Sequence, residues 1–253
     1  MRILLTNDDG IQAIGLRALY RALTLAGHEV EVVAPLTEQS AVGHAITIFS
    51  PLRAKKINEN GFEGIGFSGT PVDCVKWALS FYFRSKPDLV ISGINNGANV
   101  GVDVLYSGTV SAATEGALAN VPSIAVSVDN FCPQNLEAEA TWVVDFLNQL
   151  DWQIFAERIV LNLNFPKHGV KQAKGFKVCP QTDAVYQDRY EQRRDPRNRE
   201  YYWLSGEIPA DQVLPDTDRY LLWQGYITLT PLRFDLTHRE LLPKLANWFK
   251  LDK

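Results

Sequence analysis

The run "RILLTNDDGI", Arg2–Ile11, decides the fold class, because its apolar residues lead directly into polar residues and a glycine. Asp8 and Asp9 stand side by side where this apolar run ends. Two adjacent carboxylates repel each other and cost free energy unless a positive group lies between them. The run therefore predicts a buried strand whose carboxyl end is a turn suited to a cation.

Outward from this run, strand-like and helix-like segments alternate along the first two thirds of the chain. The predicted strands are Arg2–Thr6, Glu29–Pro35, Asp88–Ser92, Ser123–Val128 and Arg158–Pro166. The predicted helices are Leu16–Ala26, Pro71–Phe83, Ser107–Asn120 and Leu136–Leu150. Such alternation is typical of a mostly parallel sheet with crossover helices, so we expect an α/β fold, a three-layer αβα sandwich.

The last third of the chain has a different pattern, rich in strands. Asp183–Leu204 predicts two strands around a turn at Asp195–Asn198. Gly225–Leu232 predicts a further strand and Glu240–Phe249 a closing helix. Because an isolated hairpin is marginally stable in water, we expect the aromatic hairpin to dock on a neighbour.

Composition excludes several classes of protein. The chain has 253 residues and a formal net charge of -4, which disfavours binding to polymeric nucleic acid. No apolar run reaches the length of a membrane span and no signal peptide is recognisable, so we expect no membrane association. Cys74, Cys132 and Cys179 show no metal or disulfide spacing, which favours reduced thiols and a cytoplasmic protein.

Polar segments follow the predicted strands and should meet at one edge of the sheet, where α/β proteins bind ligands. These segments are Asn7–Gly10, Leu36–His44, Gly93–Gly101 and Tyr106–Thr109. Asp8 and Asp9 supply carboxylates, and Ser40, Asn95 and Asn96 add neutral oxygens. Such hard donors suit Mg²⁺, Mn²⁺ or Ca²⁺.

An anion site is predicted beside these oxygens. Ser107, Gly108 and Thr109 begin a predicted helix, whose free N–H groups attract anions. A cation beside an anion site indicates a phosphate ester as ligand. Simpler alternatives stay open at this point: Ser107 or Thr109 can be an ordinary N-cap, and Asp-Asp-Gly an ordinary turn. His44 is a weak candidate for a general acid.

Familiar nucleotide and hydrolase motifs are absent from the sequence. It contains no G-x-G-x-x-G after the first strand, no G-x-x-x-x-G-K-[ST] and no G-x-S-x-G. These absences argue against a dinucleotide-binding site, a P-loop and a serine hydrolase of the nucleophile-elbow type.

The motifs taken together resemble the SurE family of stationary-phase survival proteins, over Arg2 to about Leu232. They are "RILLTNDDGI", "VVAP", "SGTPVDCV", "ISGINNGANVG", "YSGTVSAATEG" and "GYITLTPL". The resemblance implies a divalent-metal-dependent phosphatase with one Mg²⁺ or Mn²⁺ per subunit. It also implies nucleoside 5′-monophosphates as substrates, with 3′-monophosphates and short polyphosphate as further ones.

The resemblance also implies roles for particular residues. The implied metal ligands are Asp8, Asp9, Ser40 and Asn95, of which Asp8, Asp9 and Asn95 are also the implied catalytic residues. The implied substrate-binding residues are Asn99, Ser107, Gly108 and Thr109.

The same resemblance implies an architecture. It predicts one domain over residues 1–253, with a Rossmann-like core over 1–170 and a β-rich extension with the final helix over 171–253. The hairpin would join subunits into a homodimer or homotetramer.

Some features depart from the family pattern or leave alternatives open. Ala13-Ile14-Gly15 replaces the family's usual Ala-Pro-Gly. The segment Leu36–Gln39 lacks the basic residues that are usual there, and this lack of positive charge should weaken the binding of highly charged substrates. Either aspartate could orient or deprotonate water, or act as nucleophile. A haloacid-dehalogenase-type phosphatase would have Asp-x-Asp. A nucleotide sensor that binds without turnover is the alternative of another class.

Overall fold

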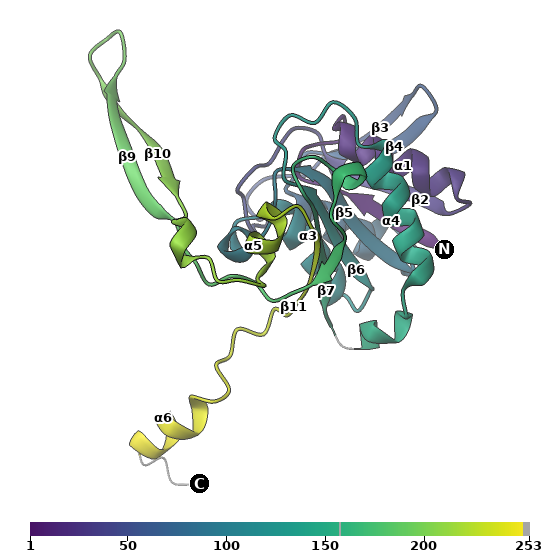
Figure 1. Cartoon of the computed structure of the whole chain (residues 1–253). Helices are drawn as coiled ribbons and strands as arrows, with labels where there is room; N and C mark the ends of the chain where they lie inside the picture. Colours follow the sequence, from purple (N-terminus) through teal and green to yellow (C-terminus); the bar gives the residue numbers. More distant parts are fainter. Residues whose placement is uncertain (157, 250–253) are drawn as a thin grey trace.

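A mixed, mostly parallel sheet forms the centre of the protein (Figure 1). The computed structural model describes residues 1–156 and 158–249, so residues 250–253 of the predicted extension lie outside the described residues. Within the described residues the sheet has nine strands in the order β3-β4-β2-β1-β5-β6-β7-β11-β8. Its strands are β1 (Arg2–Thr6), β2 (Glu29–Pro35), β3 (Ala54–Glu59), β4 (Phe62–Phe67), β5 (Leu89–Asn96), β6 (Ser123–Val128), β7 (Val160–Phe165), β8 (Phe176–Val178) and β11 (Ile227–Leu232).

Helices cover both faces of this sheet, which confirms the predicted three-layer αβα sandwich. On one face, α1 and α4 bury Leu16, Leu19 and Leu147 in the largest core cluster. On the other face, α2 and α3 bury Val75 and Ala112. Each fully buried leucine stabilises the fold by about 1.5–3 kcal/mol, so these apolar stripes fix both outer layers. The helices are α1 (Ile14–Leu25), α2 (Pro71–Trp77), α3 (Gly108–Leu118), α4 (Glu137–Gln149), α5 (Asp218–Trp223) and α6 (Leu242–Trp248).

The strand register brings the predicted polar segments to one edge. β1 lies between β2 and β5 and is parallel to both, with Thr6 opposite Ser92. The expectation that the third strand ends at Ser92 is wrong, because β5 continues to Asn96. A register shift between Ser92 and Asn95 lets the strand pair with β6 again. Asn95 and Asn96 therefore lie on a strand and not in a loop.

Other boundaries differ from the prediction for local reasons. The predicted helix Pro71–Phe83 is α-helical only to Trp77 and then widens into a π-helical turn at Ala78–Tyr82. The hairpin β3–β4 was not predicted, since β3 buries only Ile57 and β4 contains Gly64 and Gly66. Neither strand carries a clear alternation of apolar residues.

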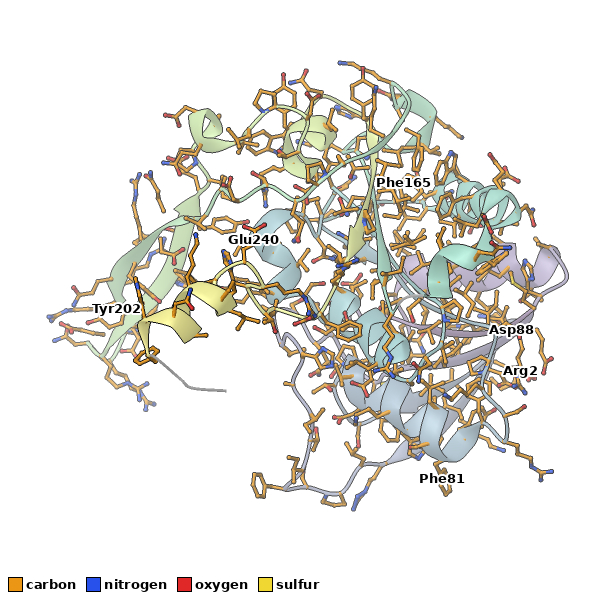
Figure 2. All side chains as sticks on the ribbon, turned by 90° about the horizontal axis from the view of Figure 1, so that it is seen from below. Arg2, Phe81, Asp88, Phe165, Tyr202 and Glu240 are labelled. Carbon is orange, nitrogen blue, oxygen red and sulfur yellow. The ribbon has the colours of Figure 1, made fainter. Side chains whose placement is uncertain are left out.

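Within the C-terminal third, β8 and β11 join the central sheet, whereas the hairpin between them forms an arm outside the sandwich. β9 (Gln187–Arg194) and β10 (Glu200–Glu207) make the predicted antiparallel hairpin, and every residue of both strands is exposed. Figure 1 shows this hairpin and α6 projecting from the core as separate extensions, and Figure 2 shows Tyr202 and Glu240 on them, away from Phe165. In the described residues no helix is long and apolar enough to span a membrane.

Candidate active site

An open pocket of about 180 Å³ lies at the carboxyl edge of the sheet. Its wall brings together side chains from four predicted segments, far apart in the sequence. The predicted site residues that line it are Asp8, Ser40, Asn95, Asn99 and Ser107. Three further predicted residues, Asp9, Gly108 and Thr109, are not in the wall but contact residues that are.

Asp8 is the buried carboxylate of the pocket. It lies two residues after Thr6, the last residue of β1, and is only 6% exposed. Burial raises the pKa of Asp8, and this effect is partly offset by hydrogen bonds from the side chain and backbone of Thr109. Thr109 Oγ1 donates to Asp8 Oδ1, so the first turn of α3 holds one carboxylate oxygen and leaves the other for a ligand.

Asp9 is held behind the pocket wall by the end of β5. Its Oδ2 accepts a hydrogen bond of 2.9 Å from the backbone N–H of Asn96. Burial, together with the nearby charges of Asp8 and Glu38, raises the pKa of Asp9 to about 7 against the lowering effect of the Asn96 hydrogen bond. The ionised forms of the adjacent carboxylates are therefore strained in the folded protein, chiefly by burial and, for Asp9, also by the charge of Asp8.

This strain predicts how the stability of the metal-free protein depends on pH. The pKa of Asp9 is about 7 when folded and 3.8 when unfolded, so its stabilising effect is complete below pH 3.8 and is lost as pH rises through 7. In EDTA, Tm should fall between pH 5 and pH 8. Asp9→Asn should reduce that fall by about 3 °C or more in differential scanning calorimetry. An equal fall in both proteins would contradict the assignment.

The loop that carries Ser40 is fixed against the pocket at both ends. The backbone N–H of Gln39 donates to the carbonyl of Asp8 at 2.8 Å, and that of Gly43 to the carbonyl of Tyr106 at 2.9 Å. Ser40 Oγ donates to Glu38 Oε1 at 2.5 Å, which leaves its lone pairs free to accept or coordinate. These backbone bonds keep Ser40 in the wall although its side chain is exposed.

Asn95 lies on β5 with its amide oriented by the chain. Its Nδ2 donates to the carbonyl of Gly97 at 2.7 Å, which turns Oδ1 away from that carbonyl. The side chain is 9% exposed and lines the pocket. The hydrogen bond to Gly97 leaves its oxygen uncommitted, in a side chain that lines the same pocket as Asp8.

Asn99 lies in the wall but has a structural role that the sequence did not reveal. Its Nδ2 donates to Ser127 Oγ at 2.8 Å, and its backbone N–H donates to Asn164 Oδ1 at 2.8 Å. Asn162 Nδ2 donates to the carbonyl of Asn99 at 2.8 Å. Asn162 and Asn164, at alternate positions of the otherwise apolar β7, were the available signal for this support.

The start of α3 combines an N-cap with a close backbone approach. Ser107 Oγ accepts from the N–H of Val110 at 3.1 Å, so Ser107 is the N-cap as well as a wall residue. A Cβ atom at Gly108 would lie 2.8 Å from Asp8 Cβ, and only glycine fits there. The helix N-terminus, with its partial positive charge, therefore directly adjoins Asp8.

His44 lies outside the wall, and the structure does not support it as an acid. Its Nε2 lies 3.0 Å from Glu115 Oε2, and Lys76 Nζ contacts the same carboxylate at 2.8 Å. His44 thus belongs to a cluster of polar contacts around Glu115 of α3, together with Lys76 of α2.

The residues of the pocket fit a hard divalent cation rather than zinc. In residues 1–156 and 158–249 no group of three or more His, Cys, Asp or Glu side chains is arranged to hold a metal. A cation would depend on neutral oxygens beside the carboxylates, as Mg²⁺ and Mn²⁺ do. Two buried Oδ1 atoms have no hydrogen-bond donor: that of Asn7, which precedes Asp8 in the sequence, and that of Asn96, whose backbone N–H contacts Asp9. This excess of acceptors favours a cation.

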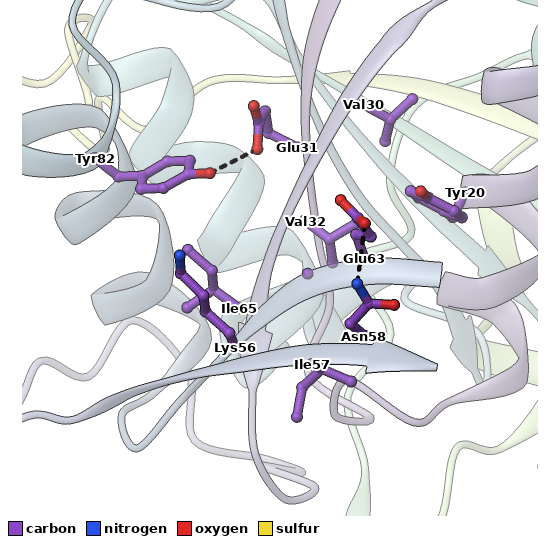
Figure 3. A pocket seen from close by; sticks show the side chains of 11 residues that line it. Tyr20, Val30, Glu31, Val32, Lys56, Ile57, Asn58, Glu63, Ile65 and Tyr82 are labelled. Carbon is purple, nitrogen blue, oxygen red and sulfur yellow. Dashed lines mark hydrogen bonds between the residues drawn. The ribbon is translucent and has the colours of Figure 1, made fainter. Parts of the chain in front are cut away.

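A larger cavity of about 390 Å³ lies between the first half of β2 and the β3–β4 hairpin (Figure 3). Tyr82 donates to Glu31 at 2.8 Å and Asn58 to Glu63 at 3.1 Å within it. It contains none of the predicted site residues. The smaller pocket, which gathers them, is therefore the candidate active site.

Comparison with known proteins agrees with the family predicted from the motifs. The family model described as "Survival protein SurE" matches residues 3–188. This chain belongs to the SurE family. The SurE match includes β1, the Ser40 loop, β5 and the start of α3, and so spans the whole pocket wall.

SurE relatives match nearly the full length. The 5′-nucleotidase SurE of Solidesulfovibrio magneticus is 59% identical over 246 residues, which cover 97% of this chain and 96% of that protein. The 5′-nucleotidase SurE of Maridesulfovibrio salexigens is 55% identical over 98% of this chain and 99% of that protein. The crystal structure of the SurE protein from Aquifex aeolicus has a TM-score of 0.81 at 36% identity, covering 98% of this chain and 100% of that one.

Proposed function

We propose that this chain is a 5′-nucleotidase, a phosphoric monoester hydrolase that releases phosphate from nucleoside 5′-monophosphates. The observation that carries this proposal is the pocket wall, which gathers oxygens of Asp8, Ser40 and Asn95 beside the N-terminus of α3. Relatives named 5′-nucleotidase SurE, 55–59% identical over nearly the whole chain, support it.

One divalent cation per subunit, Mg²⁺ or Mn²⁺, would be held by Asp8, Asp9, Ser40 and Asn95. Such a cation polarises a phosphate oxygen and lowers the pKa of a bound water. The oxygen-only set of donors supports the choice of metal. In this proposal both carboxylates would come from the turn after β1, and the neutral oxygens from the Ser40 loop and from β5.

The chain itself would bind and orient the phosphate. The N-terminus of α3 presents the N–H of Gly108 and the wall side chain of Ser107 to an anion. The Thr109 hydrogen bond fixes Asp8 in one orientation, so its second oxygen faces a ligand without reorganisation. Asn99, also in the wall, would contact substrate with its backbone held by Asn162 and Asn164 of β7.

Charge in the pocket favours monophosphates over polyphosphates. Among the described wall residues none is Lys, Arg or His, while Asp8 and Asp103 are acidic. Each further phosphate adds negative charge that no side chain of the wall compensates. Nucleoside 3′-monophosphates and short polyphosphate are thus proposed as secondary substrates.

The test measures phosphate release from AMP, 3′-AMP and tripolyphosphate with Mg²⁺, Mn²⁺ or EDTA. We expect metal-dependent release, with kcat/KM for AMP on the order of tenfold or more above that for tripolyphosphate. Equal or faster tripolyphosphate hydrolysis would overturn the charge argument. AMP binding in calorimetry without phosphate release, in folded protein with either metal, would favour the nucleotide sensor.

The arm suggests the mode of assembly. Tyr190, Tyr202 and Trp203 are 70%, 56% and 59% exposed on the hairpin. We propose that this surface joins subunits into a homodimer or homotetramer, which would bury these rings.

A cytoplasmic location also stays a prediction, consistent with free Cys74, Cys132 and Cys179.

A further inference from the structure

Two exposed aromatic side chains in the pocket wall have no part in the proposed phosphate chemistry. Tyr106 is 59% exposed and Phe131 is 79% exposed, and both line the pocket that contains Asp8. Neither ring belongs to any of the buried clusters of the fold. Large apolar surface held open beside a binding site commonly marks a place where a ligand lies.

The Phe131 ring is positioned by the floor of the pocket. It lies so close to Gly97 that a Cβ atom there would be 2.7 Å from Phe131 Cε1. Gly97 has φ +107° and donates its N–H to the carbonyl of Val128 at 2.9 Å, so this floor is tied to β6. The ring is therefore seated directly on backbone that follows Asn95 and Asn96.

Tyr106 is positioned by the same elements that hold the candidate ligands. Its carbonyl accepts the N–H of Gly43 from the Ser40 loop at 2.9 Å. Its N–H donates to the carbonyl of Asp103 at 3.0 Å, in the turn just before Ser107. The backbone of Tyr106 thus lies between the Ser40 loop and the start of α3, which are two sides of the phosphate site.

The size of the pocket indicates where the rest of a nucleotide must lie. At about 180 Å³ it is smaller than the roughly 300–1,000 Å³ of pockets that enclose drug-sized ligands. A phosphate held beside Asp8 and Ser107 would fill much of this space, so the nucleoside would extend over the wall. The exposed rings are the apolar surface available to it there.

We propose that Tyr106 and Phe131 form a stacking surface for the nucleobase of the substrate, an inference that rests on the proposed nucleotidase function. Stacking on aromatic rings tolerates every base, because every base has a π face. The surface would therefore distinguish nucleotides from sugar phosphates rather than one base from another.

The first test uses adenosine, which carries no phosphate and is not turned over. In calorimetry, Phe131→Leu and Tyr106→Leu should each raise the Kd of adenosine about tenfold, while Tyr106→Phe, which keeps the ring, should stay near wild type. Phe81→Leu changes another exposed ring, outside the pocket, and is the matched control. Unchanged Kd values in both leucine variants, or no adenosine binding at millimolar concentration, would overturn the proposal.

A second readout locates the bound nucleoside. Cys132 is exposed beside Phe131, whereas Cys74 and Cys179 are buried. Adenosine should slow the alkylation of Cys132 by iodoacetamide in the wild type and less so in Phe131→Leu, as followed by mass spectrometry. An unprotected Cys132 at saturating adenosine would place the base elsewhere and contradict the proposal.

Hydrolysis separates this proposal from the function on which it rests. The ratio of kcat/KM for AMP to that for ribose 5-phosphate should fall about tenfold in Phe131→Leu. Suppose that the wild type releases phosphate, but Phe131→Leu changes neither this kcat/KM ratio nor the Kd of adenosine. The proposed stacking surface is then wrong, and the proposed nucleotidase function is retained. Suppose instead that no phosphate is released, but adenosine binding still depends on Tyr106 and Phe131. The proposed stacking surface is then retained, and the proposed nucleotidase function is wrong.

Discussion

Asp8→Asn should remove nearly all phosphate release from AMP at saturating Mn²⁺. The loss should exceed the roughly 10–100-fold that changes around a metal ligand cause, because Asp8 itself would contact the metal. Asp8 is the buried carboxylate of the pocket wall, and an amide there supplies no negative charge. Initial rates measured over a range of Mn²⁺ concentrations should show a lower maximal rate and a higher Mn²⁺ concentration at half of that rate.

The same variant should not be destabilised when metal is absent. Burial raises the pKa of Asp8, so its ionised form costs free energy in the folded protein at pH 8, and a neutral amide avoids that cost. The Tm of Asp8→Asn in EDTA should therefore equal or exceed that of the wild type. Asp145→Asn, on the exposed face of α4, should leave both activity and Tm unchanged. Full metal-dependent activity in folded Asp8→Asn would refute the assigned role.

Thr109→Val should reduce kcat/KM for AMP about 10–100-fold, as expected for the partner of a metal ligand. Thr109 is fully buried and its hydroxyl donates to Asp8, so valine keeps the volume but leaves that oxygen without its donor. The pKa of Asp8 should rise further, because the side-chain hydrogen bond lowers it. The loss should therefore be larger at pH 6 than at pH 8.

Two matched variants separate this role from packing. Thr109→Ser keeps the hydroxyl and should recover most of the activity lost in Thr109→Val. Thr114→Val removes a hydroxyl from the same helix, where it only donates to the carbonyl of Val110 at 2.8 Å, and should leave kcat/KM and its pH profile unchanged. Similar losses in Thr109→Ser and Thr109→Val would show that Asp8 does not depend on this hydrogen bond.

The core of the fold was predictable because its signals are local. Short, mostly apolar segments such as Ser123–Val128 are typical of strands covered on both faces, and β6 has the predicted bounds. The β3–β4 hairpin was not predictable in this way, because it lies at the edge of the sheet with one buried residue in β3. Its place beside β2 is determined by tertiary pairing, which no short window of sequence contains.

The candidate site was predictable only as a set of strand ends. Asp8, Ser40 and Asn95 meet in one wall because parallel strands align their carboxyl ends. The sequence did not indicate that Asp9 turns toward the N–H of Asn96, since that direction depends on where β5 ends. Nor did it reveal that Asn162 and Asn164 support Asn99 from a neighbouring strand. Long-range polar contacts of this kind require the register of the sheet.

The hairpin arm has a further consequence for the solubility of the protein. β9 and β10 form a separate two-stranded sheet, so each strand has one edge without a hydrogen-bonded neighbour. A strand of another molecule could pair with such an edge, and repeated pairing would build a fibre. Charged side chains such as Arg189, Arg193 and Glu191 interrupt β9, and Arg194 pairs with Glu200 at 2.8 Å across the strands. Because charged side chains along an open strand edge oppose the addition of further strands, the arm should resist fibre formation.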